Sequence, residues 1–366
     1  MMLKNINSPS TLLLATGKGL IVYRKKTNKW LFSGDHFLGF SVSAVLADDR
    51  TGFWWVALDH KHWGQKLHRS RDEGKSWEEM PAPVYPKGEE IRPGLPATMK
   101  YIWTIAKGGQ QQPGRLYLGT EPGGLFMSDD GGESFSLNQN LWSHPSRPDH
   151  WFGGGRNFAG IHSVVVDPRD ESHVYVAVSC AGVFETKDDG RTWKTKHKGL
   201  KADYLPDPYP EVGYDPHLLL GCMSQPEVLW QQNHCGVYRS SDGGENWQDI
   251  TAADGSNYYG FALATDPENP EVAWVIPAHS DKIRVAIDHS LFVQRTDDGG
   301  KTWQTFRKCL PQGDCYDIVL RHSLAVSGDR LAFGTISGCL YLSEDRGESW
   351  EMINHSLPRV FSAVFI

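Results

Sequence analysis

The sequence is short of three features that mark whole classes of protein. No apolar run approaches the ~18 residues of a membrane-spanning helix. Cysteine is scarce, with 6 in 366 residues, too few for a disulfide-stapled scaffold. Positive charge is not in excess, because 37 Lys and Arg face 44 Asp and Glu for a net charge of −7. Nucleic acids and anionic membranes both require a basic face, so the charge argues against either as a partner.

The few cysteines and the first residues bear on the cellular compartment. Cys309 and Cys315 could pair, but free thiols in a reducing compartment are the favoured interpretation. The N-terminal segment MMLKNINSPSTLLLATGKG contains only a four-residue apolar run and lacks a small-residue cleavage site. We therefore expect a first strand here rather than a secretion signal, and a cytoplasmic protein.

Aromatic residues and turn formers are abundant. The chain contains 14 Trp, 15 Phe and 13 Tyr, enough for a large core. Its 38 Gly and 21 Pro are spread along the whole length. This composition is typical of many short strands separated by turns, and it argues against disorder. The sequence therefore predicts an all-β fold.

An internal repeat is the strongest signal in the sequence. Six octads share the pattern Ser or Thr, any residue, Asp, any, Gly, any, a small polar residue and an aromatic. Their aromatic residues recur every 47 to 58 residues, at Trp77, Phe135, Trp193, Trp247, Trp303 and Trp350. Counting back 47 residues from Trp77 reaches Trp30, which ends a degenerate seventh copy with Lys25 where the Asp is expected.

Each octad has the chemistry of a tight hairpin turn. The Asp side chain can accept backbone N–H bonds across the turn, and the Gly can adopt a positive φ. The aromatic residue can then fold inward as a packing anchor. About 50 residues and four strands per unit, in seven units, describe a seven-bladed β-propeller.

The two ends of the chain predict how the ring closes. The first unit contains only three strands, and residues 359–366 form one surplus strand. We expect this strand to pair into the first blade, which leaves no open sheet edge. The predicted single domain, residues 1–366, then has these blades: 12–33 with 359–366, 38–80, 100–140, 160–197, 215–250, 258–307 and 316–353.

The octads resemble the Asp-box (BNR) repeat of sialidases, large xyloglucan-cleaving glycosidases, sortilin-type receptors and photosystem II assembly factors. The resemblance spans nearly the whole chain and implies a propeller, but those proteins do unrelated things. Bacterial single-domain propellers classed as glycosyl hydrolases or sialidase-like proteins are a closer resemblance. The stretches that resemble these bacterial propellers are Trp151–Gly155, Gly160–Ser163, Val178–Gly182, Asp215–His217 and Gln232–Gly236.

Histidines gather at one face of the predicted ring. Aligning the inner strands on the repeat puts His162, His217 and His322 at one equivalent position, with Phe261 and Trp103 at matching positions. A turn returning to the same face carries His234. Imidazoles that converge there would suit Zn, Fe, Cu or Ni, and an open position holding water would make the site catalytic. An organic-ligand site without metal, or purely structural histidines, are the alternatives.

Further polar and aromatic residues fall on turns and long loops of the same face. Loops on a rigid scaffold commonly carry function, and aromatic rings mixed with polar groups suit a sugar-like ligand. The predicted catalytic residues are Glu121, Asp215, His234 and Arg156. The predicted substrate-binding residues are Trp151, Asn157, Tyr204, His279, Arg284 and His60.

The residues leave three functions open. The favoured one is a metal-assisted or His-dependent enzyme, hydrolase- or lyase-like, acting on a small polar or carbohydrate-like substrate. The second is a sialidase-like glycoside hydrolase with two carboxylates ~5–9.5 Å apart. Sialidases share an Arg-Ile-Pro motif, which is reordered here to Ile91-Arg92-Pro93. The third is a non-catalytic binding or assembly scaffold.

Overall fold

Strands make up almost all of the regular structure in the computed structural model, which describes residues 10–60 and 62–366. In this part of the chain the helices are α1 (Gln139–Trp142), α2 (Arg147–His150) and a single 3-10 turn (Ile287–His289). None of them has the length or apolar character to cross a membrane. The all-β prediction is therefore confirmed. Residues 1–9, which bear on the expected absence of a secretion signal, lie outside the described part.

Five sheets have four antiparallel strands each, in sequence order. The first two contain β4 (Ser41–Asp48), β5 (Phe53–His60), β6 (Gly64–Ser70) and β7 (Glu78–Met80), and β10 (Tyr101–Lys107), β11 (Leu116–Glu121), β12 (Leu125–Ser128) and β13 (Ser136–Leu137). The third contains β14 (Ile161–Asp167), β15 (Asp170–Val178), β16 (Gly182–Thr186) and β17 (Lys194–Thr195). The fourth and fifth contain β18 (Pro216–Gly221), β19 (Leu229–Asn233), β20 (Gly236–Ser240) and β21 (Gln248–Asp249), and β22 (Gly260–Thr265), β23 (Ala273–Pro277), β24 (Val293–Thr296) and β25 (Gln304–Phe306).

The two ends of the chain meet in an eight-stranded sheet of order β29-β28-β27-β26-β30-β1-β2-β3. Its strands are β1 (Thr11–Thr16), β2 (Gly19–Lys26), β3 (Lys29–His36), β26 (Val319–Ser327), β27 (Arg330–Thr335), β28 (Leu340–Ser343), β29 (Glu351–Asn354) and β30 (Val360–Phe365). The C-terminal strand β30 pairs antiparallel with β1, as expected for closure. Between β26 and β30 the pairing consists of a single bridge, from His322 to Ser362. Four strands lie on either side of this weak junction. A small separate hairpin contains β8 (Glu90–Arg92) and β9 (Leu95–Pro96).

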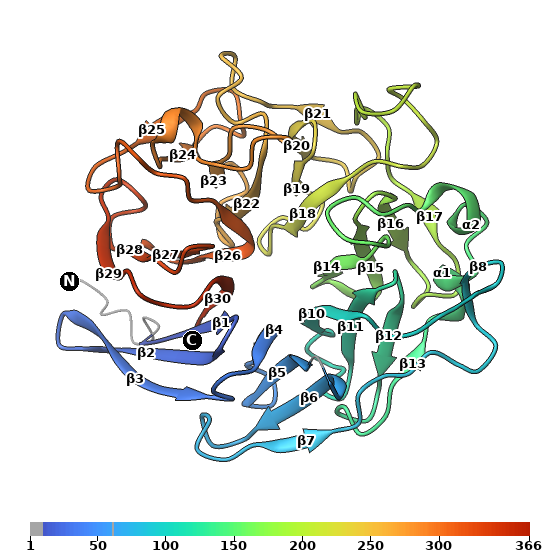
Figure 1. Cartoon of the computed structure of the whole chain (residues 1–366). Coiled ribbons are helices and arrows are strands. Elements are labelled where there is room, and N and C mark those ends of the chain that lie inside the picture. Colours follow the sequence, from blue (N-terminus) through green and yellow to red (C-terminus); the bar gives the residue numbers. More distant parts are fainter. Residues whose placement is uncertain (1–9, 61) are drawn as a thin grey trace.

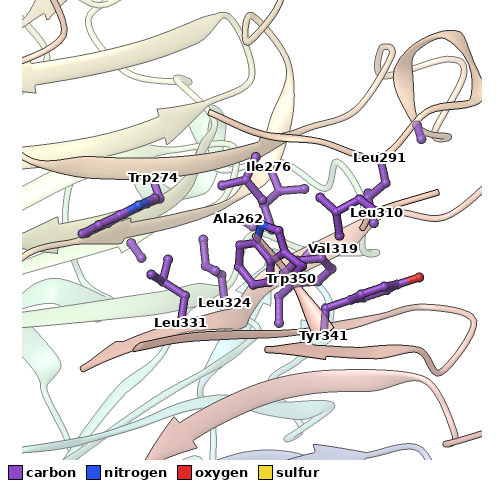
Figure 2. Close-up of a cluster of buried hydrophobic side chains, with 14 of the residues drawn as sticks. Ala262, Trp274, Ile276, Leu291, Leu310, Val319, Leu324, Leu331, Tyr341 and Trp350 are labelled. Carbon is purple, nitrogen blue, oxygen red and sulfur yellow. The ribbon is translucent and has the colours of Figure 1, made fainter. Parts of the chain in front are cut away.

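The sheets stand side by side around a central axis (Figure 1). The first strands of successive sheets contact one another from β4 through β10, β14, β18 and β22 to β26, and β30 contacts both β26 and β4. These strands form the inner wall of the ring. Apolar side chains fill the space between neighbouring sheets. Figure 2 shows one such layer, in which Trp274 and Trp350 pack with leucine, isoleucine and valine side chains of the two last sheets.

The Asp boxes form the turns between the third and fourth strands. In the first, the Asp72 carboxylate accepts hydrogen bonds from the Ser76 backbone N–H at 2.8 Å and its hydroxyl at 2.7 Å. The Gly74 N–H donates to the Ser70 hydroxyl, and Gly74 has a φ of 88°. The five other complete copies repeat this pattern around Asp130, Asp188, Asp242, Asp298 and Asp345. The turn chemistry expected from the octads is confirmed.

A neighbouring carboxylate compensates for the missing Asp of the degenerate copy. Lys25, at the Asp position, pairs with Glu344 of the last octad at 2.8 Å. The Trp30 indole N–H donates to the same carboxylate at 3.0 Å. Glu344 thus ties the first unit of the chain to the last.

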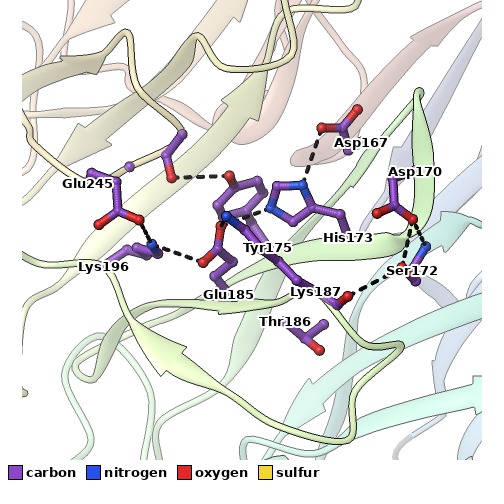
Figure 3. Close-up of polar contacts among 12 residues, drawn as sticks. Asp167, Asp170, Ser172, His173, Tyr175, Glu185, Thr186, Lys187, Lys196 and Glu245 are labelled. Atoms are coloured by element: carbon purple, nitrogen blue, oxygen red, sulfur yellow. Dashed lines mark hydrogen bonds and ion pairs between the residues drawn. The ribbon is translucent and has the colours of Figure 1, made fainter.

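A buried ionic network ties the β14–β17 sheet to the next one (Figure 3). Glu185 lies 2.8 Å from His173 and 2.9 Å from Lys196, which also contacts Glu245 of the following sheet. Burial alone would raise the pKa of Glu185, but the hydrogen bonds from His173 and Lys196 lower it to about 2. The carboxylate is therefore ionised and paired inside the ring.

Candidate functional site

A cavity of about 570 Å³ opens where the inner strands begin. Its wall combines inner-strand residues with residues from the loops that precede or follow them. A second cavity of about 350 Å³ shares Trp103, Arg321 and His322 with the first and continues along the inner strands. The lining of the larger cavity combines polar and charged side chains with aromatic rings, as is common in sites for organic ligands.

Bulges in the inner strands explain why certain side chains reach the cavity. The pairing register shifts around Ser43, Trp103, His162, His217 and Phe261, one residue in each of five inner strands. A bulged residue leaves the regular alternation of the ladder and can be redirected. Four of them, Trp103, His162, His217 and Phe261, are positions that the internal repeat aligned. All of them except His162 line the cavity.

Three polar residues of the β18–β21 sheet form the centre of the site, and we call them the Asp215 cluster: Asp215, His217 and His234. Asp215 precedes β18, His217 lies in β18 and His234 follows β19. The Asp215 Oδ2 atom lies 3.4 Å from His217 Nε2 and 3.4 Å from His234 Nδ1. Its Oδ1 atom accepts hydrogen bonds from the Ser179 hydroxyl and the Cys180 N–H, both at 3.0 Å.

The hydrogen bonds of His217 fix its tautomer. Its Nδ1 atom lies 2.5 Å from the Gly260 carbonyl oxygen, which can only accept, so Nδ1 carries the proton. Burial lowers the pKa of His217, although Asp215 opposes this. Burial would raise the pKa of Asp215, but the neighbouring imidazoles hold it well below its usual range. When His217 is neutral, the lone pair of its Nε2 atom faces the Asp215 carboxylate, and when Nε2 also carries a proton it donates to that carboxylate.

The space between His217 Nε2 and Asp215 Oδ2 suits either a proton on Nε2 or a metal ion that both atoms ligate. The ligand atoms of the Asp215 cluster all lie within 4.8 Å of one another, and no other group of three such residues occurs in the part of the chain that the structure describes. Ligands at ~2.0–2.1 Å from a tetrahedral ion lie roughly 3.3–3.4 Å apart. The two 3.4 Å separations fit this geometry. One carboxylate and two imidazoles also suit a divalent transition metal.

A second carboxylate lies on the far side of His234. The Asp281 Oδ2 atom is 3.8 Å from His234 Nε2, so one imidazole ring separates Asp281 from Asp215. This spacing is compatible with the ~5–9.5 Å between the paired carboxylates of glycosidases. Asp281 also pairs with Arg284 at 3.1 Å, and both residues line the cavity.

The structure does not bring all four predicted metal ligands together. His162 is fully buried, and its two nitrogens lie 2.8 Å from the Pro216 carbonyl oxygen and 2.9 Å from the Ser163 hydroxyl. Neither nitrogen is free for a metal, so the role predicted for His162 does not fit this geometry. His322 lines the cavity, but its Nε2 atom lies 2.9 Å from the His162 carbonyl oxygen, and burial lowers its pKa to about 4. His217 and His234 remain, with Asp215 in place of the other histidines.

The other predicted residues divide into two groups. Arg156, Tyr204 and Arg284 line the cavity. Glu121 is buried behind it and pairs with Arg156, so it orients that arginine rather than facing a ligand. The predicted ligand contacts that do not line the cavity are Trp151, Asn157, His60 and His279.

Local contacts explain why two of these residues, Trp151 and His60, lie outside the cavity. The Trp151 ring packs on Phe184 at 5.1 Å and its indole N–H donates to the Ser146 hydroxyl, so it pins a loop. His60 stacks on Phe40 at 4.8 Å, outside the cavity. Loop aromatics can serve either purpose, and sequence alone does not separate the two.

Several residues of the cavity were missed by the sequence analysis. They are Asp281, Arg321, Arg359, Tyr101 and Phe152. Arg321 had one available signal, since it directly precedes His322 in an aligned inner strand. All six cysteines are unpaired, Cys309 is exposed, and burial raises the pKa of Cys180 far above its usual range. The Cys180 thiol is therefore a poor nucleophile at neutral pH.

Comparison with known proteins agrees with this architecture. Residues 294–305 match the BNR/Asp-box repeat model. The chain is 25% identical over 218 residues to the oligoxyloglucan-reducing end-specific xyloglucanase of Emericella nidulans, covering 52% of this chain and 25% of that protein. It is 22% identical over 292 residues to xyloglucanase Xgh74A of Acetivibrio thermocellus, covering 72% of this chain and 33% of that protein.

The chain thus spans a quarter to a third of the length of these curated relatives. Among solved structures, an ancestral GH74 enzyme superposes with a TM-score of 0.58 at 16% identity, over 94% of this chain and 40% of that chain. The expected resemblance to Asp-box propellers of the glycosyl hydrolase type is confirmed. The structural similarity at this identity concerns the fold alone.

Proposed function

We propose that the protein is a carbohydrate-acting hydrolase whose reaction takes place in the 570 Å³ cavity. The observation that carries the proposal is the placement of Asp215 and Asp281 on opposite sides of His234, inside a cavity lined by aromatic rings. The sequence similarity to two xyloglucanases supports a glycan as the substrate class. Aromatic side chains of the cavity wall, such as Phe152 and Phe361, supply apolar surface against which a sugar ring can pack.

The chain's own residues divide the work between two sides of the cavity. On the buried side, Asp215, His217 and His234 direct lone pairs to one point and hold it rigidly, because each has a further hydrogen bond or ring contact behind it. On the open side, Asp281 is part exposed and is held by Arg284. Asp281 is therefore the group placed to exchange a proton with a bound substrate.

The same proposal assigns a divalent transition metal to the Asp215 cluster, with Zn²⁺ the best fit to a tetrahedral site. Such an ion, when bound, supplies a Lewis acid and lowers the pKa of a bound water toward neutrality. His217 and Asp215 would hold it through the lone pairs that otherwise oppose each other.

We also propose seven blades in one domain. The single bridge between β26 and β30 supports counting the eight-stranded sheet as two blades, which joins five four-stranded sheets in the ring. The inner strands β4, β10, β18, β22, β26 and β30 contribute to the cavity wall, whereas no residue of β14 does.

The experiment is a screen of neutral and charged oligosaccharides and aryl glycosides for release of reducing ends or of the aryl group. The wild-type protein should cleave at least one substrate, and Asp281→Asn should lose roughly 10²-fold or more of that activity. Asp149→Asn is the control, because Asp149 is exposed on α2 and outside the cavity. A protein that binds sugars without cleaving any of them would instead be a binding scaffold, and the proposal would be wrong.

A further inference from the structure

One arginine of the cavity has no partner. Arg321 makes no hydrogen bond or ion pair to any group in residues 10–60 and 62–366, and its Nε atom is buried without an acceptor. Burial lowers the pKa of Arg321. An arginine nevertheless stays charged in a protein, so the cavity wall contains a guanidinium whose donors are unused.

Aromatic rings hold this guanidinium in place. Its Cζ atom lies 5.1 Å from the Trp103 ring centre and 5.0 Å from that of Phe261. Phe261 in turn stacks on His217, with centroids 4.6 Å apart and planes at 25°. Phe261 therefore contacts both Arg321 and the Asp215 cluster. A group bound by Arg321 would sit about one aromatic ring away from the proposed reaction centre.

The other cavity arginines show how unusual this is. Arg156 pairs with Glu121, and Arg284 pairs with Asp281. Arg359 is exposed to solvent, which stabilises its charge. Arg321 is the one of the four that lies half-buried between rings with no hydrogen bond or ion pair in the described residues, although the charge of Asp215 acts on it beyond contact distance. The carboxylate of Asp215 is engaged by its own cluster and does not contact Arg321.

We propose that the cavity binds a sugar that carries an anionic substituent, a carboxylate, sulfate or phosphate, and that Arg321 is the partner of that group. The proposal rests on the carbohydrate site proposed above and adds its substrate class. A guanidinium binds these groups through two parallel N–H···O bonds, and the pair is strong where water is excluded. Removing a charged group from water without a partner costs free energy, which binding of an anion would offset.

Binding is measured by calorimetry with four defined probes: methyl β-glucuronide, glucose 6-sulfate, glucose 6-phosphate and the neutral methyl β-glucoside. At least one anionic probe should bind the wild-type protein tenfold or more tightly than the neutral glucoside. Arg321→Met should abolish that preference and leave the affinity for the glucoside unchanged, whereas Arg321→Lys should restore part of it. Which anionic probe binds best identifies the substituent.

The matched control is Arg71→Met, because Arg71 also lies beside a ring, 5.3 Å from Phe53, but is exposed and outside the cavity. This variant should bind like the wild type. Equal affinity for neutral and anionic probes, no binding of any probe, or a preference that survives Arg321→Met would each overturn the inference. So would sodium sulfate binding as tightly as glucose 6-sulfate, which would indicate an adventitious ion only. The calorimetry requires no turnover. It therefore tests the role of Arg321 even if the protein hydrolyses none of the glycans in the screen.

Discussion

The Nε2 atom of His217 lies 3.4 Å from the Oδ2 atom of Asp215, while Nδ1 of the same ring is held by a carbonyl oxygen 2.5 Å away. The imidazole therefore has no proton to offer the carboxylate unless it becomes charged. Burial opposes that charge. A second proton on the imidazole or, in the function proposed above, a metal ion between the two side chains would balance the buried carboxylate.

The first prediction concerns metal binding. Zn²⁺ titrated into the metal-free wild-type protein should bind with one site per chain, observed by calorimetry or by a metal-indicator competition. His217→Ala and His234→Ala should each weaken the affinity by more than tenfold, because each removes one of three ligands. His279→Ala should not, because His279 is exposed and outside the cavity. Equal affinity in all four proteins would refute the assignment.

The second prediction is that His162 is structural and not a ligand of the metal proposed for the Asp215 cluster. Both of its ring nitrogens have buried partners, so His162→Ala should lower the free energy of unfolding by about 2 kcal/mol. It should leave the Zn²⁺ affinity unchanged. Chemical denaturation and metal titration of the same variant test both statements. A stable variant with weakened Zn²⁺ binding would reverse our assignment.

The third prediction uses the ionic network of Glu185. Its folded pKa of about 2 lies below the ordinary value of ~4.3, so its stabilisation is present above pH ~4.3 and is lost as the pH falls through about 2. Glu185→Gln leaves Lys196 without a buried partner and should cost about 3 kcal/mol at pH 7. It should also flatten the acid decline of the melting temperature. The exposed Glu351→Gln is the control, and a steep acid decline retained in Glu185→Gln would contradict the argument.

The fourth prediction tests closure of the ring. Val360 in β30 is fully buried, and Gly334 approaches its side chain so closely that an added Cβ would meet it at 2.5 Å. Val360→Ala should therefore cost about 2 kcal/mol. Removing residues 359–366 should expose two strand edges and cause self-association, seen by light scattering. The exposed Ile366→Ala should behave like the wild type, and an unaltered monomer after the truncation would count against closure by β30.

Much of the fold could be predicted because its signals are local. Each Asp box contains within eight residues the hydroxyl, carboxylate and glycine that its turn needs, as the bonds of Asp72 show. The pairing of β30 with β1 followed from counting strands. The alignment of inner strands also worked, because bulges recur at equivalent residues such as Trp103 and His217.

The site was harder to predict, because its geometry depends on side chains from different sheets. His162 and His217 are equivalent in the repeat, yet one is enclosed by backbone and the other faces the cavity. Asp281 lies in a loop of no regular pattern, and its nearness to His234 depends on how two neighbouring sheets pack. The place of Arg321 beside His322 in an inner strand could have indicated the cavity, but a sequence does not show that its side chain makes no hydrogen bond or ion pair in the described residues.

The most direct test of the account is the kcat/KM for glycan cleavage by Asp215→Asn relative to the wild type, measured on the best substrate from the screen. Asparagine keeps the size of the side chain but removes the charge that holds His217 and His234 around one point. We predict a loss of at least 10²-fold in a protein that is still folded by circular dichroism, with a lowered melting temperature because the buried carboxylate loses its charge. Cleavage at the wild-type rate by a folded Asp215→Asn protein would contradict the central claim that the Asp215 cluster is the reaction centre.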